Sequence, residues 1–157
     1  FELEAVGREK HLLQLRNPPA GTYISEVRLS NEDALATGVD LMNASLLARF
    51  DIVLGTDPGG IEGFIANGEG RTVTLLPDPA APNQPFRAHQ TVADADGVFV
   101  FKDVAPGSYR VVAMDDITPD LVAEEALVSG LQNRGVRVTV SAGVVERIRL
   151  RVEDPVQ

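Results

Sequence analysis

The stretch TVADADGVFVFKDVAPGSYRVVAMDD, residues 91–116, most constrains what this chain can fold into. It joins an Asp-x-Asp-Gly turn, the alternating run Val98–Phe101 and an Ala-Pro-Gly turn. Alternation with a period of two is typical of a β-strand, and Gly and Pro mark turns. The pattern predicts a central β-hairpin, in which either the phenylalanines or the valines of the run face the core.

The rest of the chain also favours strands. Its 157 residues are 44% hydrophobic but only 5% aromatic, and valine is abundant. Valine is enriched in strands because its branched side chain packs well on a pleated surface. One helix is expected, over residues 119–135, where Pro119 suits a first helical position and Gly135 a C-terminal stop. The sequence therefore predicts an all-β fold with one short helix.

Charge and composition exclude several functions. The formal net charge of -9 opposes binding to nucleic acid and to anionic lipid surfaces. No apolar run approaches the roughly 20 residues that span a bilayer, so membrane insertion is not expected. The chain has no Cys, and His11 and His89 are far apart, so a zinc site is not expected either.

The order of strand and turn patterns predicts two units. Residues 1–57 hold too few strands to close a β-sandwich of about seven, and read as the last strands of a partial sandwich. The TDPGG turn at residues 56–60 marks the boundary. Residues 58–157 hold enough strands for a complete sandwich. In the first unit, alternation places Tyr23, Ser25, Val27 and Leu29 on one face of a strand.

Three segments resemble a known family: GFIANGEGRTVTLLPD, then the opening stretch, then NRGVRVTVSAGVVERIRLRV. They are similar to the carboxypeptidase regulatory-like and Cna protein B-type domains of bacterial surface and secreted proteins. The resemblance covers roughly residues 58–153. It implies a Greek-key, immunoglobulin-like or prealbumin-like β-sandwich that serves as a spacer, stalk or assembly module without catalysis. Some relatives carry a Lys-to-Asn isopeptide bond, but the only lysines here, Lys10 and Lys102, do not fit that pattern.

Asp94 and Asp96 are the first candidate metal ligands. Their i, i+2 spacing lets two carboxylates converge on calcium, with Gly97 for the sharp turn. An EF-hand is excluded, because its next ligand positions fall on Val98 and Ala105. The alternative is a turn in which the aspartates bond to nearby backbone amides. Both interpretations stay open from the sequence.

Further carboxylates are weaker candidates for calcium binding. Asp115 and Asp116 follow a strand, but adjacent residues of an extended chain point to opposite faces. Asp57 lies in the predicted linker, where calcium could stiffen the joint between units. Solvated carboxylates are the alternative for each. No nucleophile motif, phosphate loop or raised-pKa carboxyl pair is evident, so an enzyme is not expected.

Three functions are compatible with these features. The first is an extracellular or cell-surface building block whose copies associate through sheet edges, because a partial sandwich exposes strands that another chain can pair with. The second is a module that binds carbohydrate or protein, although the chain has no Trp and only two Tyr for a sugar platform. The third is an accessory domain of a larger enzyme.

Overall fold

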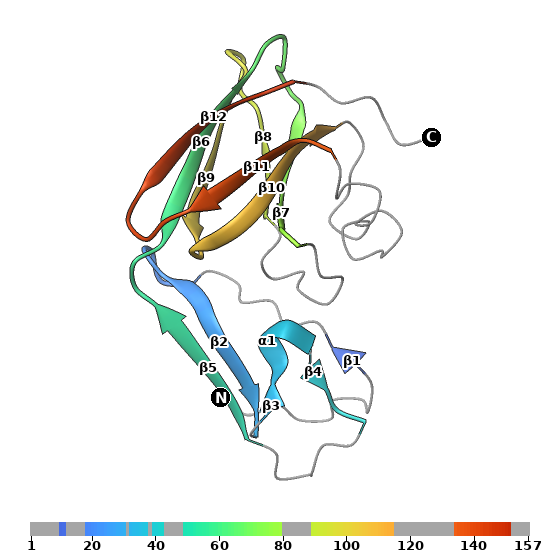
Figure 1. The fold of residues 1–157 in the computed structure, drawn as a ribbon, viewed down its shortest axis with the longest axis vertical. Helices are drawn as coiled ribbons and strands as arrows, with labels where there is room; N and C mark the ends of the chain where they lie inside the picture. The colour runs from blue at the N-terminus through green and yellow to red at the C-terminus, as the bar shows by residue number, and fades with distance from the viewer. Residues whose placement is uncertain are drawn as a thin grey trace.

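The computed structural model describes residues 10–11, 18–30, 32–37, 39–42, 49–79, 89–114 and 134–151. Nearly all of the regular structure in these residues is β-strand, as expected from the sequence (Figure 1). The strands form four sheets with separate hydrophobic core clusters for the residues before and after position 57. None of the helices among the described residues is long and apolar enough to cross a membrane.

Seven strands after position 57 form a β-sandwich. One sheet has four strands in the order β11-β10-β7-β8, and the other has three in the order β12-β6-β9. Among the described strands, only β12 and β6 pair in parallel. This β-sandwich agrees with the Greek-key, prealbumin-like architecture that the family resemblance implies. The strands are β6 (Gly59–Ile65), β7 (Thr72–Pro77), β8 (His89–Val92), β9 (Val98–Val104), β10 (Gly107–Met114), β11 (Val136–Val140) and β12 (Val145–Leu150).

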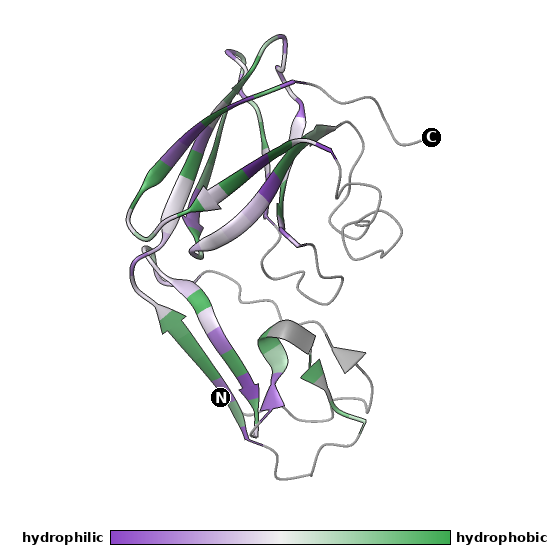
Figure 2. Cartoon of the chain, in the orientation of Figure 1, coloured by the Kyte–Doolittle hydropathy of each residue, from purple (hydrophilic) through white to green (hydrophobic). Residues whose placement is uncertain are grey.

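The core of the sandwich lies between its two sheets, where strand residues alternate between apolar and polar (Figure 2). In β9, Phe99 and Phe101 are buried against the core, whereas Val100 is exposed. The two phenyl rings meet edge to face, with centroids 5.9 Å apart. The sequence left open whether the phenylalanines or the valines of this run face the core. The structure shows that the phenylalanines do.

The predicted hairpin between β9 and β10 is wrong. β9 pairs with β6 in the three-stranded sheet, whereas β10 pairs with β7 and β11 in the four-stranded sheet. The Ala105–Pro106 connection therefore crosses from one sheet to the other. Val104 and Ala105 are buried at this crossing, and the Tyr109 hydroxyl donates to the Ala105 carbonyl at 2.7 Å. The Ala-Pro-Gly motif indicates a sharp reversal of the chain, but it does not indicate which strand pairs with β9.

The residues before position 57 form a smaller set of strands. β2 (Tyr23–Leu29) lies between β5 (Phe50–Gly55) and the short β3 (Glu32–Asp33), and β1 (Lys10–His11) pairs with β4 (Val39–Asp40). The only helix among the described residues is the single turn α1 (Ala34–Thr37). Val27, Ala34, Leu35 and Val39 are buried together, with Ile24, Leu29, Leu41 and Phe50 packed against them.

A β-bulge changes the predicted faces of β2. Ile24 pairs with Leu54, but Glu26 already pairs with Val53, so Ser25 is the extra residue. The Ser25 hydroxyl donates to the Val53 carbonyl at 3.1 Å. A bulge shifts the alternation by one residue. Ile24 therefore joins Val27 and Leu29 at the core, and the prediction that Tyr23 and Ser25 share their face is wrong.

The connection between the two sets of strands is shorter than the TDPGG pattern suggests. Only Thr56, Asp57 and Pro58 lie between β5 and β6, because Gly59 and Gly60 already belong to β6. A β-carbon at Gly59 would lie 2.4 Å from Val140 Cγ1. This glycine therefore serves close packing within the sandwich. The division of the chain at residue 57 into separately folding domains stays a prediction.

The predicted helix at residues 119–135 lies outside the described residues, apart from its last two positions. Arg134 and Gly135 form a bend that leads into β11. Gly135 has a φ of +69°, and a β-carbon there would lie 2.1 Å from the Val111 carbonyl oxygen. A positive φ is available to Gly at little cost. Gly135 thus allows the chain to enter the sheet beside β10.

Candidate functional site: an aspartate turn, an arginine cluster and open sheet edges

The Asp-x-Asp-Gly motif forms a closed local turn between β8 and β9. Asp94 Oδ1 accepts hydrogen bonds from the backbone N–H groups of Asp96, at 3.0 Å, and Val98, at 2.8 Å. The Asp94 carbonyl accepts from the Gly97 N–H at 2.9 Å. Gly97 has a φ of +77°, and a β-carbon there would lie 2.2 Å from the Ile65 carbonyl oxygen. These bonds are those expected of the turn interpretation.

The predicted calcium ligands do not gather into one site in the described part of the chain. Asp94, Asp96 and Asp57 are exposed, with Asp57 in the connection between β5 and β6. Asp115 and Asp116 lie outside the described residues. Among the residues that the structure places, no three His, Cys, Asp or Glu side chains are grouped to hold a metal ion. Calcium binding by these aspartates stays a prediction.

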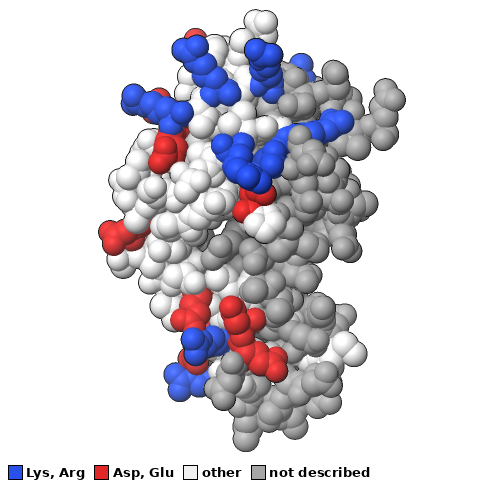
Figure 3. Space-filling view, in the orientation of Figure 1, with Lys and Arg blue, Asp and Glu red and all other residues white. Residues whose placement is uncertain are grey.

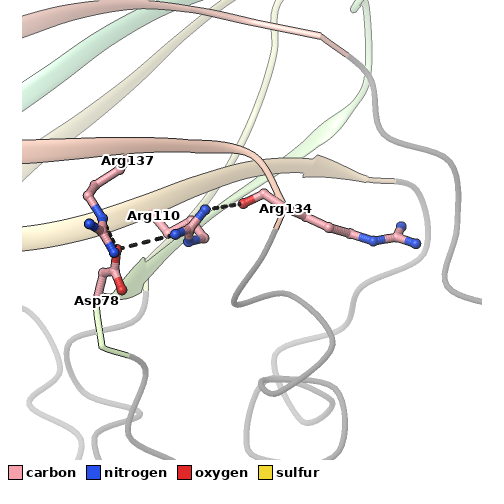
Figure 4. Close-up of polar contacts among 4 residues, drawn as sticks. All are labelled: Asp78, Arg110, Arg134 and Arg137. Carbon is pink, nitrogen blue, oxygen red and sulfur yellow. Dashed lines mark hydrogen bonds and ion pairs between the residues drawn. The ribbon is translucent and has the colours of Figure 1, made fainter.

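A second carboxylate, Asp78, lies between two arginines at the end of β7 (Figure 4). Its Oδ2 atom lies 2.5 Å from Arg137 Nε and 3.5 Å from Arg110 Nη2. Arg110 also donates from Nη1 to the Arg134 carbonyl at 3.0 Å. The side chains of Asp78 and Arg110 are only 11% and 15% exposed, whereas that of Arg137 is 68% exposed. The cluster therefore connects β7, β10 and the start of β11.

This cluster lies on the side of the four-stranded sheet that faces away from the sandwich core. Leu76 pairs with Arg110, and that residue pairs in turn with Arg137 across the sheet. On the same side, Thr74, Leu76 and Val112 are buried. The central parts of β7 and β10 are thus buried on both faces. The Nε atom of Arg110 is buried with no hydrogen-bond partner among the described residues.

Sequence reasoning missed this cluster because its members are far apart in the chain. Asp78 is 32 residues from Arg110 and 59 from Arg137. The only available signals were an Asp at the end of a strand pattern and an Arg within each of two apolar strands. Their meeting depends on the order of strands in the sheet, which one sequence does not show.

His89 lies at the start of β8, opposite Leu75, which belongs to the core cluster. Residues that pair directly across a sheet share a face, so His89 is on the core side. Burial lowers the pKa of its imidazole below the ordinary value of 6.5, because a charged ring loses hydration there. Burial therefore favours the neutral form of the ring.

The outer face of the three-stranded sheet carries exposed apolar side chains. Phe64 on β6 is 42% exposed and pairs with Val98 on one side and Arg149 on the other. Val100 and Val145 are exposed by 42% and 59%. Phe64 is the only exposed aromatic residue in the described ranges. Tyr109, by contrast, is buried.

Positive charge is concentrated at the end of the described sequence. Residues 134–151 contain Arg134, Arg137, Arg147, Arg149 and Arg151 but a single acidic residue, Glu146, in a chain of net charge -9. Figure 3 shows Lys and Arg side chains gathered over the sandwich. All of these arginines except Arg134 are exposed. The β11–β12 segment is thus a basic surface on an acidic protein.

Comparisons with known proteins reveal no family for this chain. No protein-family model matches it, and no curated protein sequence is similar to it. A solved structure of a candidate carbohydrate-binding protein from Pseudomonas aeruginosa is 16% identical, with a TM-score of 0.37, and the match covers 60% of this chain and 88% of that one.

Two pilins are also among the similar structures. The major pilin subunit of Bacillus cereus is 11% identical, with a TM-score of 0.36, and the match covers 88% of this chain and 57% of the pilin. A streptococcal ancillary pilin is 13% identical, with a TM-score of 0.38, and the match covers 87% of this chain and 43% of the pilin. The chain therefore spans about half the length of these pilins. Similarities this weak carry no argument about function.

Proposed function

We propose that this chain is a non-catalytic structural module of an extracellular or cell-surface assembly, whose copies associate in series through the edges of their sheets. The observation that carries the proposal is the number of open edges. In the described sheets, β12, β9, β11, β8 and β5 each pair with a strand on one side only. Unpaired edges offer backbone N–H and C=O groups to a further strand.

The strands before position 57 are the most open part of the fold. β3 pairs with β2 at Arg28 and Leu29 only. The remaining length of β2 is therefore paired on one side only, by β5, among the described strands. Val53 of β5 is 46% exposed. Completion of this sheet by a strand from a neighbouring copy would bury these groups, which is the mode of association predicted from the sequence.

The arrangement of the carboxylates supports a non-catalytic role. Asp78 is paired with two arginines, and Asp94 is used by its own turn. Neither has the apolar cleft with a second carboxyl that acid and base catalysis needs. Lys102 is exposed on β9, so it does not suit the buried isopeptide bond that some relatives of the resembled family carry.

Sedimentation velocity over a range of protein concentrations tests self-association directly. We expect the sedimentation coefficient to rise with concentration, and electron microscopy of the concentrated sample to show linear arrays. Hydrogen exchange at high and low concentration should show added protection in edge strands. A single monomeric species at every concentration, with the same exchange pattern, would contradict the proposal.

A carbohydrate- or protein-binding module is the second candidate, and Phe64 is the observation that favours it. An exposed ring on the outer face of a sheet, beside Val98 and Arg149, offers a surface on which a sugar ring or an apolar side chain could pack. A glycan array tests this function. Binding that is lost in Phe64→Ala but kept in Val92→Ala, an exposed residue of the other sheet, would favour it over self-association.

A further inference from the structure

β12 has an outer edge to which an extended segment could add. It pairs with β6 on one side, and no other described strand pairs with it. The strand is six residues long. Such an edge can accept a strand through main-chain hydrogen bonds, and the neighbouring side chains then select which sequence fits.

From Arg147 to Leu150, the side chains of β12 alternate between exposed positive charge and apolar packing, after an exposed Val145 and a half-buried Glu146. Arg147 and Arg149 are exposed on the outer face of the sheet, and Arg151 follows directly after the strand. Ile148 packs against the core and Leu150 is buried. Because side chains that neighbour one another across a sheet share a face, an added strand would need acidic residues on one face and apolar residues on the other.

We propose that the occupant of this edge is the segment Phe1–Val6 of a second copy of the chain. Its sequence, FELEAV, alternates apolar residues with Glu2 and Glu4. Added beside β12, it would place these two carboxylates next to the arginines and its apolar residues next to Ile148. The segment lies outside the described residues. The inference rests on the proposed function and names the two surfaces that join.

Charge complementarity favours this occupant over other strands. Glu62 of β6 lies 3.4 Å from Arg147 and partly neutralises it, while Arg149 and Arg151 have no acidic residue opposite them in β6. Arg149 instead pairs with Phe64. A segment with two carboxylates on one face supplies the missing negative charge. Opposite charges that neighbour one another across strands stabilise their pairing.

A fluorescent peptide, FELEAVGRE, tests the acceptor edge on the full chain. We expect saturable binding that weakens as salt is raised, since the charges are exposed. Arg147→Glu combined with Arg149→Glu should weaken binding by about tenfold or more, because two attractive pairs become repulsive. Arg49→Glu, at an arginine of similar exposure before β5, is the matched control and should leave binding unchanged.

Charge exchange separates specific pairing from a general effect on folding. A peptide with Glu2→Lys and Glu4→Lys should bind poorly to the unmodified chain and bind well to the Arg147→Glu, Arg149→Glu variant. Strand addition should also slow hydrogen exchange at alternate backbone amides of β12, because these amides would donate to the added strand. Electrostatic contact between side chains alone would not slow this exchange. Absence of peptide binding, binding without this protection, or no recovery on charge exchange would overturn the inference.

The outcomes also distinguish this inference from the proposed function. If the full chain self-associates but the peptide does not bind, copies join through a different edge and only the inference fails. If the peptide binds with the expected pattern but the full chain stays monomeric at all concentrations, β12 is an acceptor edge and the proposal of serial assembly fails.

Discussion

Asp94 Oδ1 accepts a hydrogen bond from the Val98 backbone N–H at 2.8 Å, across the turn that carries the chain from one sheet of the sandwich to the other. The same oxygen accepts from the Asp96 N–H. Asp96, by contrast, contributes its backbone to this turn, and its side chain is exposed. The two aspartates of one motif thus have different structural roles.

Substitution of the two aspartates should therefore have unequal effects on stability. Asp94→Ala removes the acceptor of two hydrogen bonds and should lower the free energy of unfolding by about 1–2 kcal/mol. Asp96→Ala should change it by less than about 0.5 kcal/mol, as for most surface substitutions. Urea unfolding of both variants measures the difference. Equal losses would contradict the turn assignment.

The calcium prediction can be tested with a further variant of the same turn. If Asp94 and Asp96 hold calcium, the ion should raise the Tm by mass action and a chelator should reverse the increase. Asp96→Asn is the informative variant, because it removes a carboxylate without touching the Asp94 hydrogen bonds. If calcium and chelator leave the Tm unchanged, both in the unmodified chain and in Asp96→Asn, the calcium prediction is wrong. Asp94 and Asp96 would then serve only to shape the turn.

Gly63→Ala should destabilise the sandwich. A β-carbon at this position would lie 2.0 Å from Cζ of Phe99, whose ring covers the glycine from the neighbouring strand. Overpacking of this kind costs about 1–3 kcal/mol. Phe99→Leu should relieve this clash, because leucine is smaller than phenylalanine. Gly63→Ala should therefore lower the free energy of unfolding by less in the Phe99→Leu background than in the unmodified chain. A double-mutant cycle from urea unfolding measures this coupling.

Asp78→Ala should be more damaging than Arg137→Ala. Loss of the carboxylate leaves Arg110 mostly buried without its counter-charge, which we expect to cost about 3 kcal/mol. Arg137 is largely exposed, so its removal should cost less than about 1 kcal/mol. Arg110→Met combined with Asp78→Ala should recover part of the loss, because no buried charge then remains. Equal effects of the two single substitutions would contradict this account.

His89 should make stability depend on pH. Burial lowers the pKa of His89, so the unfolded chain binds a proton at a higher pH than the folded chain does. The contribution of His89 to stability is therefore complete above about pH 6.5 and decreases as the pH falls toward the pKa of the folded state. His89→Gln should reduce the stability difference between about pH 7.5 and about pH 5.5. His11→Gln is the control, and an equal reduction there would contradict the assignment.

Local patterns predicted much of this fold because they depend on neighbouring residues. In β12, for example, Ile148 and Leu150 lie inward and the arginines lie outward, which follows the simple alternation of apolar and basic residues in the sequence. The bulge at Ser25 could not be predicted in this way, because it arises from the pairing of β2 with β5. The Asp78 cluster could not be predicted either, because its ion pairs depend on the order of strands in the sheet.

The sequence by itself determined that the described part of the chain is nearly all β-strand, that residues 91–114 reverse direction at an Asp-Gly and a Pro-Gly turn, and that the phenylalanines or the valines of Val98–Phe101 would be buried. These features follow from side-chain alternation and turn chemistry, which are local. Only the tertiary structure decided that both turns pass between sheets, that the phenylalanines are the buried pair, and that Asp78 meets Arg110 and Arg137. These outcomes depend on contacts between distant residues, and on which arrangement of strands buries the larger apolar side chains.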